Sequence, residues 1–253
     1  MSGRDRARAR TVVFDCDSTL VTIEGITQLA TGHRQEVSRL TTAAMSGQVP
    51  LEDVYGWRLA VVNPTRRRVL SLGRAYLRAL VPDAKEVVNA LRDAGIDVRI
   101  VSAGLLPAVQ CLAQALGIEP ERVAAVDIRF DEHGKYMGFD EASPLVRSGG
   151  KRTVIEQWQP ELKRPIWLVG DGASDVEARP VVDAFIAYTG VIRHEAAVAG
   201  ADITVSSRSL APILALVLGD DVPAGAVARE VYERGVQQLN DPTPIHRARN
   251  NRE

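Results

Sequence analysis

The sequence has few cysteines and no long apolar run, and each absence argues against a class of protein. Only two cysteines, Cys16 and Cys111, occur in 253 residues. That number is too small for a disulfide framework, so we expect a reducing, cytoplasmic location. No apolar run approaches the ~18 residues that a membrane-spanning helix needs. The N-terminal arginines are followed by no apolar segment, so we expect neither a signal peptide nor a membrane partner.

An excess of charge of one sign is also missing. The 31 basic and 32 acidic side chains give a net charge of −1, which argues against a nucleic-acid partner. The histidines show no zinc-like spacing. Residues 1–9 and 220–253 are polar or basic, and we expect them to be flexible or peripheral termini rather than nucleic-acid arms. None of these patterns predicts an oligomeric state.

What the chain does contain is an alternation of short strands and helices. Apolar residues make up 45% of it, enough for a sizeable core. The predicted strands are Val12–Phe14, Val98–Val101, Ile166–Val169, Ala184–Ala187 and Ile203–Val205. The predicted helices between them include Asp83–Ala94, Leu106–Leu116 and Lys151–Trp158. Such alternation predicts an α/β fold, with a parallel sheet covered by helices on both faces.

Two segments depart from this alternation of strands and helices. Residues 22–81 carry no clear strand and read as several helices, which predicts a helical cap inserted into a core of residues 10–21 and 82–219. The runs Val123–Phe130 and Lys135–Phe139 flank Gly134, which predicts a small β-hairpin flap. A cap placed after the first strand would lie over the strand ends, where open α/β sheets bind ligands.

Two carboxylates lie directly after the first predicted strand. Asp15 and Asp17 are two residues apart, so both point the same way from the strand or its first turn. Their repulsion costs about 1 kcal/mol at 4 Å in water and more in a drier site. A hard cation, which we expect to be Mg²⁺, would remove that cost, and a neutralised aspartate can attack phosphorus. The alternative is that these residues only mark a turn.

Three further polar clusters follow predicted strands or begin predicted helices. Ser102-Ala103-Gly104 offers a hydroxyl and backbone N–H groups to a phosphate, or is an ordinary serine N-cap. Lys151 opposes the dipole at a helix start, which favours a nearby anion, although a solvated lysine is the alternative.

The last cluster, Gly170–Asp175, repeats two carboxylates at a strand exit, with a plain turn as the alternative. Because parallel strands bring their exits to one edge, the four clusters together predict a single site.

In this order, the four clusters resemble the motifs of the haloacid-dehalogenase phosphatase superfamily, whose core is Rossmann-like. The resemblance spans roughly residues 11 to 218 and is closest to the phosphoserine phosphatase family. The family-like segments are Glu24, Met45 to Pro50, Arg58, Asn63-Pro64-Thr65, Gly138 to Glu141, Ser148 to Lys151, Ala184 to Ile186 and Val191 to Arg193.

The resemblance implies a Mg²⁺-dependent hydrolase of a small phosphomonoester, most closely O-phosphoserine. It implies that Asp15 is the nucleophile, Asp17 the general acid and base, and Lys151 a phosphate ligand. Metal ligands would be Asp15, Asp17 (through its backbone carbonyl) and Asp171, with Asp175 behind them. Substrate or phosphate would contact Glu24, Met45, Ser46, Arg58, Ser102, Ala103, Gly104, Ser174 and Arg193.

Some residues depart from the family pattern. Ala103 and Ser46 replace usual glycines, and Ser174 stands where relatives carry Thr or Asn. Glu24 and Arg58 would clamp an α-ammonium and an α-carboxylate; the alternatives are that they are surface helix residues or that they pair with each other. Alternative functions are hydrolysis of another small phosphomonoester, phosphotransfer to an alcohol, and a catalytically silent binding module.

Overall fold

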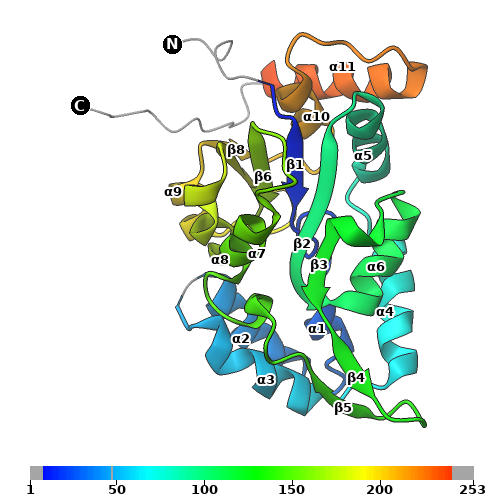
Figure 1. The fold of residues 1–253 in the computed structure, drawn as a ribbon, viewed down its shortest axis with the longest axis vertical. Coiled ribbons are helices and arrows are strands. Elements are labelled where there is room, and N and C mark those ends of the chain that lie inside the picture. The colour runs from blue at the N-terminus through cyan, green and yellow to red at the C-terminus, as the bar shows by residue number, and fades with distance from the viewer. Residues whose placement is uncertain (1–7, 47, 241–253) are drawn as a thin grey trace.

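The computed structural model describes residues 8–46 and 48–240, apart from the side chain of Met45 (Figure 1). A six-stranded sheet, in the order β3-β2-β1-β6-β7-β8, forms the centre, and every neighbouring pair is parallel. Its strands are β1 (Thr11–Phe14), β2 (Asp97–Leu105), β3 (Val123–Val126), β6 (Ile166–Gly170), β7 (Ala184–Tyr188) and β8 (Ile203–Val205). The predicted α/β class with a parallel sheet is confirmed.

Helices flank this sheet on both sides. In Figure 1, α5 and α6 lie to its right and α7, α8 and α9 to its left, while α10 and α11 lie at the top. Their bounds are α5 (Ala84–Asp93), α6 (Leu106–Ala115), α7 (Gly150–Trp158), α8 (Ala173–Glu177), α9 (Glu195–Gly200), α10 (Ala211–Leu218) and α11 (Ala226–Asn240). In the part of the chain that the structure describes, no helix is both long and apolar enough to cross a membrane.

The central strands are buried along their whole length. All residues of β1, β6 and β7 are buried, as expected for a parallel sheet covered on both faces. The β1–β6 pairing reaches past the end of β1, where the Asp15 N–H donates to the Val169 carbonyl at 2.9 Å. The exits of β1, β2 and β6 therefore meet at one edge of the sheet.

Helices α1 (Gly25–Leu29), α2 (Arg34–Met45), α3 (Leu51–Val62) and α4 (Arg66–Arg78) lie within residues 22–81, which we call the cap. At the base of the cap, Val21 and Leu80 form an isolated antiparallel bridge, which brings its two connections together. The cap lies at the end of the molecule toward which β1 points (Figure 1).

The structure corrects two predicted boundaries. Strand β2 continues to Leu105, so Ser102-Ala103-Gly104 belongs to the strand and the N-cap alternative is wrong. The run Val123–Phe130 is not one strand: β3 pairs with β2, and β4 (Ile128–Phe130) pairs with β5 (Tyr136–Phe139) in the predicted hairpin.

The expected flexible or peripheral terminus from residue 220 also contains an ordered element. Residues 226–240 form α11, which buries Val231 and Tyr232 and packs against α10 and α5. Residues 1–7 and 241–253 of the expected termini lie outside the described residues.

Candidate active site

A cavity of about 210 Å³ lies between the cap and the strand exits. Its core wall carries charged and hydroxyl groups, and its cap wall combines one acid, one base and several apolar side chains. The core contributes Asp15, Asp17, Ser102, Ala103, Gly104, Ser148, Lys151, Ala173, Ser174 and Glu177. The cap contributes Glu24, Ile26, Thr41, Ala44, Val49, Pro50, Leu51 and Arg58.

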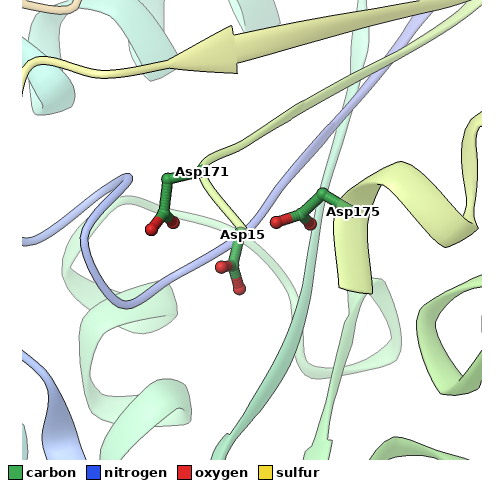
Figure 2. A group of neighbouring side chains, drawn as sticks. All are labelled: Asp15, Asp171 and Asp175. Atoms are coloured by element: carbon green, nitrogen blue, oxygen red, sulfur yellow. The ribbon is translucent and has the colours of Figure 1, made fainter. Parts of the chain in front are cut away.

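Three buried carboxylates meet at the floor of the site. One oxygen from each of Asp15, Asp171 and Asp175 lies within 4.8 Å of the others, and Figure 2 shows the three side chains converging. The Thr19 hydroxyl donates to Asp171 Oδ1 at 3.0 Å, but the buried Asp171 Oδ2 has no hydrogen-bond partner among the residues that the structure describes. An all-oxygen cluster with an unsatisfied carboxylate oxygen fits a hard divalent cation.

The electrostatics of this cluster favour the same interpretation. Burial is the main cause that raises the pKa of Asp15 to about 7, and Asp175 and Asp17 add to it while Lys151 opposes it. Burial and the neighbouring Asp15 raise the pKa of Asp171 well above its usual range. Ionising both groups without a cation is therefore costly, and a bound cation would remove much of that cost.

Lys151 connects two of these carboxylates. Its Nζ lies 2.9 Å from Asp15 Oδ1 and 2.7 Å from Asp175 Oδ1, and its side chain is buried. Burial disfavours its charge, but the two carboxylates outweigh this and raise the Lys151 pKa. The alternative of a solvated surface lysine is wrong, and the anions anticipated near the start of α7 include these two aspartates.

Asp17 lies apart from the three-carboxylate cluster. Its Oδ2 accepts from the Gly25 N–H at 3.1 Å, while no described residue forms a hydrogen bond with the buried Oδ1. Burial, followed by the nearby Glu24, raises the Asp17 pKa to about 7. A carboxyl that lines the cavity and titrates near neutrality is suited to proton transfer in both directions.

The end of β2 forms another part of the core wall. Ser102 is buried, and its Oγ accepts from the Gly104 N–H at 3.0 Å. Both residues line the cavity together with Ala103, and Ser174 lines it from α8. The phosphate-binding residues predicted in the core thus share one wall.

Glu24 and Arg58 place opposite charges on the cap wall. Glu24 Oε1 accepts from the Ser18 hydroxyl at 2.5 Å, and burial is the main cause that raises the Glu24 pKa. Arg58 is only 5% exposed, and its Nη1 donates to Thr41 Oγ1 at 2.9 Å. Within the described part of the chain, the buried Nε of Arg58 has no hydrogen-bond partner. Among the described ion pairs none joins Glu24 to Arg58, so each can receive a separate ligand group.

Two predicted contacts, Arg193 and Ser46, are not among the described residues that line the cavity. Arg193 is partly exposed and pairs with Glu195 at 2.8 Å, so the prediction that it reaches the site is not supported. The Ser46 hydroxyl donates to the Ala43 carbonyl at 3.1 Å, within its own helix end. The Met45 side chain lies outside the described residues.

Sequence reasoning missed several residues at or beside the site, four of which hold or approach the predicted ones. Thr19 and Thr41 hold Asp171 and Arg58 through their hydroxyls, and Tyr55 lies beside Arg58. The buried His194 places Nε2 3.8 Å from Asp171 Oδ2. Tyr55 could have been found from its spacing, because residues three apart share a helix face. Thr41 and His194 carry no such signal in the sequence.

Comparisons with known proteins agree with the family resemblance of the sequence motifs. The family model of the haloacid dehalogenase-like hydrolases matches residues 9–181. A phosphoserine phosphatase of Bos taurus is 39% identical over 191 residues, which are 74% of this chain and 85% of that protein. One from Drosophila melanogaster is 35% identical over 193 residues, with coverages of 74% and 72%.

A solved structure gives a matching fold. It is described as a phospho-aspartyl intermediate analogue of phosphoserine phosphatase, is 25% identical, and superposes with a TM-score of 0.69. The match covers 82% of this chain and 98% of that chain.

Proposed function

The chain belongs to the haloacid dehalogenase-like hydrolase family, and from that premise we propose that it hydrolyses O-phosphoserine to serine and inorganic phosphate. The observation that carries the proposal is the cavity itself. Its core wall offers Asp15 and Lys151 to a phosphate, and its cap wall offers Glu24 and Arg58 separately. A molecule with a phosphate at one end and both an ammonium and a carboxylate at the other matches these walls.

The phosphate would be held at the core wall. Lys151 and Ser102 would bind non-bridging oxygens, since transferring a phosphoryl group mostly requires positioning and charge neutralisation. A divalent cation, for which we propose Mg²⁺ because the donors are all oxygen atoms, would be held by Asp15, Asp171 and the Asp17 carbonyl with Asp175 behind, and would supply charge neutralisation.

Asp15 would attack phosphorus in line, forming an aspartyl-phosphate as the bond to the serine oxygen breaks. Asp17, protonated at that stage, would donate its proton to the departing serine oxygen. It would then take a proton from the water that attacks the same phosphorus and releases Asp15. A pKa of about 7 suits both roles.

Substrate choice would lie in the cap. The Arg58 guanidinium has a buried Nε without a partner, and a carboxylate would satisfy it in the two-pronged manner that arginine favours. Glu24 would pair with the ammonium, which would also counter the burial that raises its pKa.

A matched substrate pair tests this proposal. O-phosphoserine and O-phosphoethanolamine differ only in the carboxylate, so we expect kcat/KM to be much higher for phosphoserine, and activity to disappear after chelation and return with Mg²⁺. Arg58→Ala should remove most of the difference between the two substrates. Equal kcat/KM values in the wild type would eliminate the carboxylate clamp and favour a different small phosphomonoester.

The covalent step needs its own experiment. Asp15→Asn should lose turnover and should fail to retain labelled phosphate on the protein after a rapid acid quench. Retained label in that variant would assign the nucleophile to another residue.

A further inference from the structure

Tyr55 contacts both Arg58, on the cap wall of the cavity, and the end of β2, on its core wall. It lies on α3 with 1% of its surface exposed, one helical turn before Arg58. The Arg58 guanidinium carbon lies 5.4 Å from the centroid of the Tyr55 ring, within range of a cation–π interaction. At its other end, the Tyr55 hydroxyl donates to the Ala103 carbonyl at 2.9 Å.

This hydrogen bond crosses from the cap to the core. Ala103 lies between Ser102 and Gly104, in the part of β2 that lines the phosphate end of the cavity. The ring also contacts the β-hairpin, edge-on to Phe139 at a centroid separation of 5.2 Å. One buried side chain therefore connects the cap arginine, the hairpin and the phosphate-binding strand end.

We propose that Tyr55 is a positioning residue that sets the spacing between Arg58 and the phosphate-binding end of β2, and thereby selects phosphomonoesters that carry a carboxylate. The inference rests on the proposed function and deepens it. A substrate bound at both ends needs a fixed distance between the cap and core walls. A substrate bound only through its phosphate does not.

The chemistry of the two Tyr55 contacts, with Arg58 and with Ala103, indicates how Tyr55 would position Arg58. The guanidinium carbon lies over the Tyr55 ring, Nη1 donates to Thr41, and Nε has no partner among the described residues and so stays available to a ligand. The hydroxyl fixes that ring, and with it α3, against a backbone atom of the sheet. Since a pre-organised site loses less conformational freedom when a ligand binds, a loosened anchor would weaken the binding of a substrate held at both ends.

Tyr55→Phe isolates the hydroxyl, because it keeps the ring against Arg58 and Phe139. We expect KM for phosphoserine to rise about five-fold, the effect of one net hydrogen bond, with kcat little changed. We expect both constants for p-nitrophenyl phosphate, which has no carboxylate, to stay unchanged. Tyr55→Leu, which also removes the ring, should raise KM for phosphoserine further.

A double-mutant cycle tests whether Tyr55 acts through Arg58. In an Arg58→Ala background, Tyr55→Phe should no longer affect phosphoserine, because the residue it positions is gone. Tyr232→Phe is the matched control: the Tyr232 hydroxyl also donates to a backbone carbonyl, that of Gly219 at 2.6 Å, but on α11. It should lower thermal stability without changing the ratio of KM values for the two substrates.

The outcomes separate this inference from the proposed function. If Tyr55→Phe slows both substrates equally, changes neither, or still raises KM without Arg58, Tyr55 has no positioning role, and hydrolysis of phosphoserine by the wild type stands. If the wild type itself does not prefer phosphoserine over phosphoethanolamine, the proposed function fails first, and the inference fails with it.

Discussion

A single aspartate, Asp17, combines features that suit proton transfer rather than metal binding. Its carboxylate lines the cavity, bonds to the Gly25 amide and keeps one oxygen without a partner. Burial raises its pKa to about 7, so both protonation states are accessible near neutral pH. These features predict that the contribution of Asp17 to the rate is largest for substrates whose leaving group departs slowly unless it is protonated.

Asp17→Asn should lower kcat for phosphoserine by about 10²–10⁴-fold, the usual range for general acid–base catalysis. The serine alkoxide is a poor leaving group without that proton, whereas p-nitrophenolate leaves unaided. Stopped-flow measurements should therefore still show a rapid burst of nitrophenolate, followed by slow turnover. Asp15→Asn should show no burst, and a burst lost equally in both variants would contradict the role of Asp17.

For single residues, the sequence predicts which ones lie close together when the geometry of the chain requires it. It does not predict the contacts that depend on the direction of a side chain. Asp15 and Ser102 meet because parallel strands end at one edge. Arg193 follows β7, but its side chain pairs with Glu195, and the local sequence does not indicate in which direction that side chain points. The part played by Tyr55 depends on Ala103, a partner 48 positions away on another element.

Among the elements, α11 depends on a close crossing with α10. A Cβ added to Gly235 would lie 2.2 Å from the Ala211 carbonyl oxygen, a backbone atom that cannot move aside without shifting α10. Gly235→Ala should therefore destabilise the protein, because overpacking costs about 1–3 kcal/mol. This clash should outweigh the ~1 kcal/mol that alanine gains over glycine in a helix.

Thermal unfolding measures this effect, and kcat for phosphoserine should not change because α11 lies away from the cavity. Gly225→Ala is the control, since its added Cβ would meet only the Ala228 Cβ at 4.0 Å. A Gly235→Ala variant as stable as the wild type would show that α11 does not dock as described.

A second contact between elements joins the cap to the core and depends on pH. Glu52 on α3 accepts from the Ser148 N–H at 2.8 Å and from its hydroxyl at 2.9 Å, just before α7. The Ser148 N–H is the main cause that lowers the Glu52 pKa. The contact is therefore fully present above the unfolded value of 4.5 and is lost as pH falls through the lower folded value.

Glu52→Gln should accordingly lower the melting temperature slightly at pH 7, and the difference from the wild type should shrink as pH falls through the lowered folded pKa of Glu52. Glu121→Gln provides a comparison at another exposed glutamate, on the turn before β3. A difference between wild type and Glu52→Gln that persists unchanged at pH 3 would assign the effect to packing rather than charge.

Element boundaries show where sequence patterns stop being informative. The β1 and β6 strands were predicted because buried parallel strands are continuous apolar runs. The run Val123–Phe130 reads as one strand, yet the chain changes sheets near Asp127, a choice made by tertiary pairing. Helix α11 was missed because its few buried residues, such as Val231 and Tyr232, are scattered among charged ones.

For the molecule as a whole, the carboxylates gathered at the strand exits oppose folding unless something neutralises them. Asp15 and Asp17 have their pKa raised from 3.8 to about 7, so the folded protein holds protons that the unfolded chain releases. As pH rises from about 4 to about 7, the unfolded chain ionises first and the cation-free protein loses stability. Above that window the carboxylates are ionised in both states.

A divalent cation should reverse this loss, because it binds the ionised carboxylates of the folded state. At a free Mg²⁺ concentration 100 times the Kd, mass action adds about 2.7 kcal/mol. For a chain of this size, that stabilisation corresponds to a rise in melting temperature of roughly 5–10 °C. We expect this shift at pH 8 and a much smaller one at pH 5, where the proton competes with the metal.

Asp171→Asn separates metal linkage from general salt effects. It removes the carboxylate whose Oδ2 has no hydrogen-bond partner, so the cation-free variant should be less sensitive to pH and should respond weakly to Mg²⁺. Calorimetric scans of both proteins at pH 5 and pH 8, with chelator or with Mg²⁺ at constant ionic strength, provide the comparison. A Mg²⁺ shift of equal size at both pH values, or one that survives in Asp171→Asn, would mean that the cation binds elsewhere. The convergence of strand ends would then not be what creates the metal site.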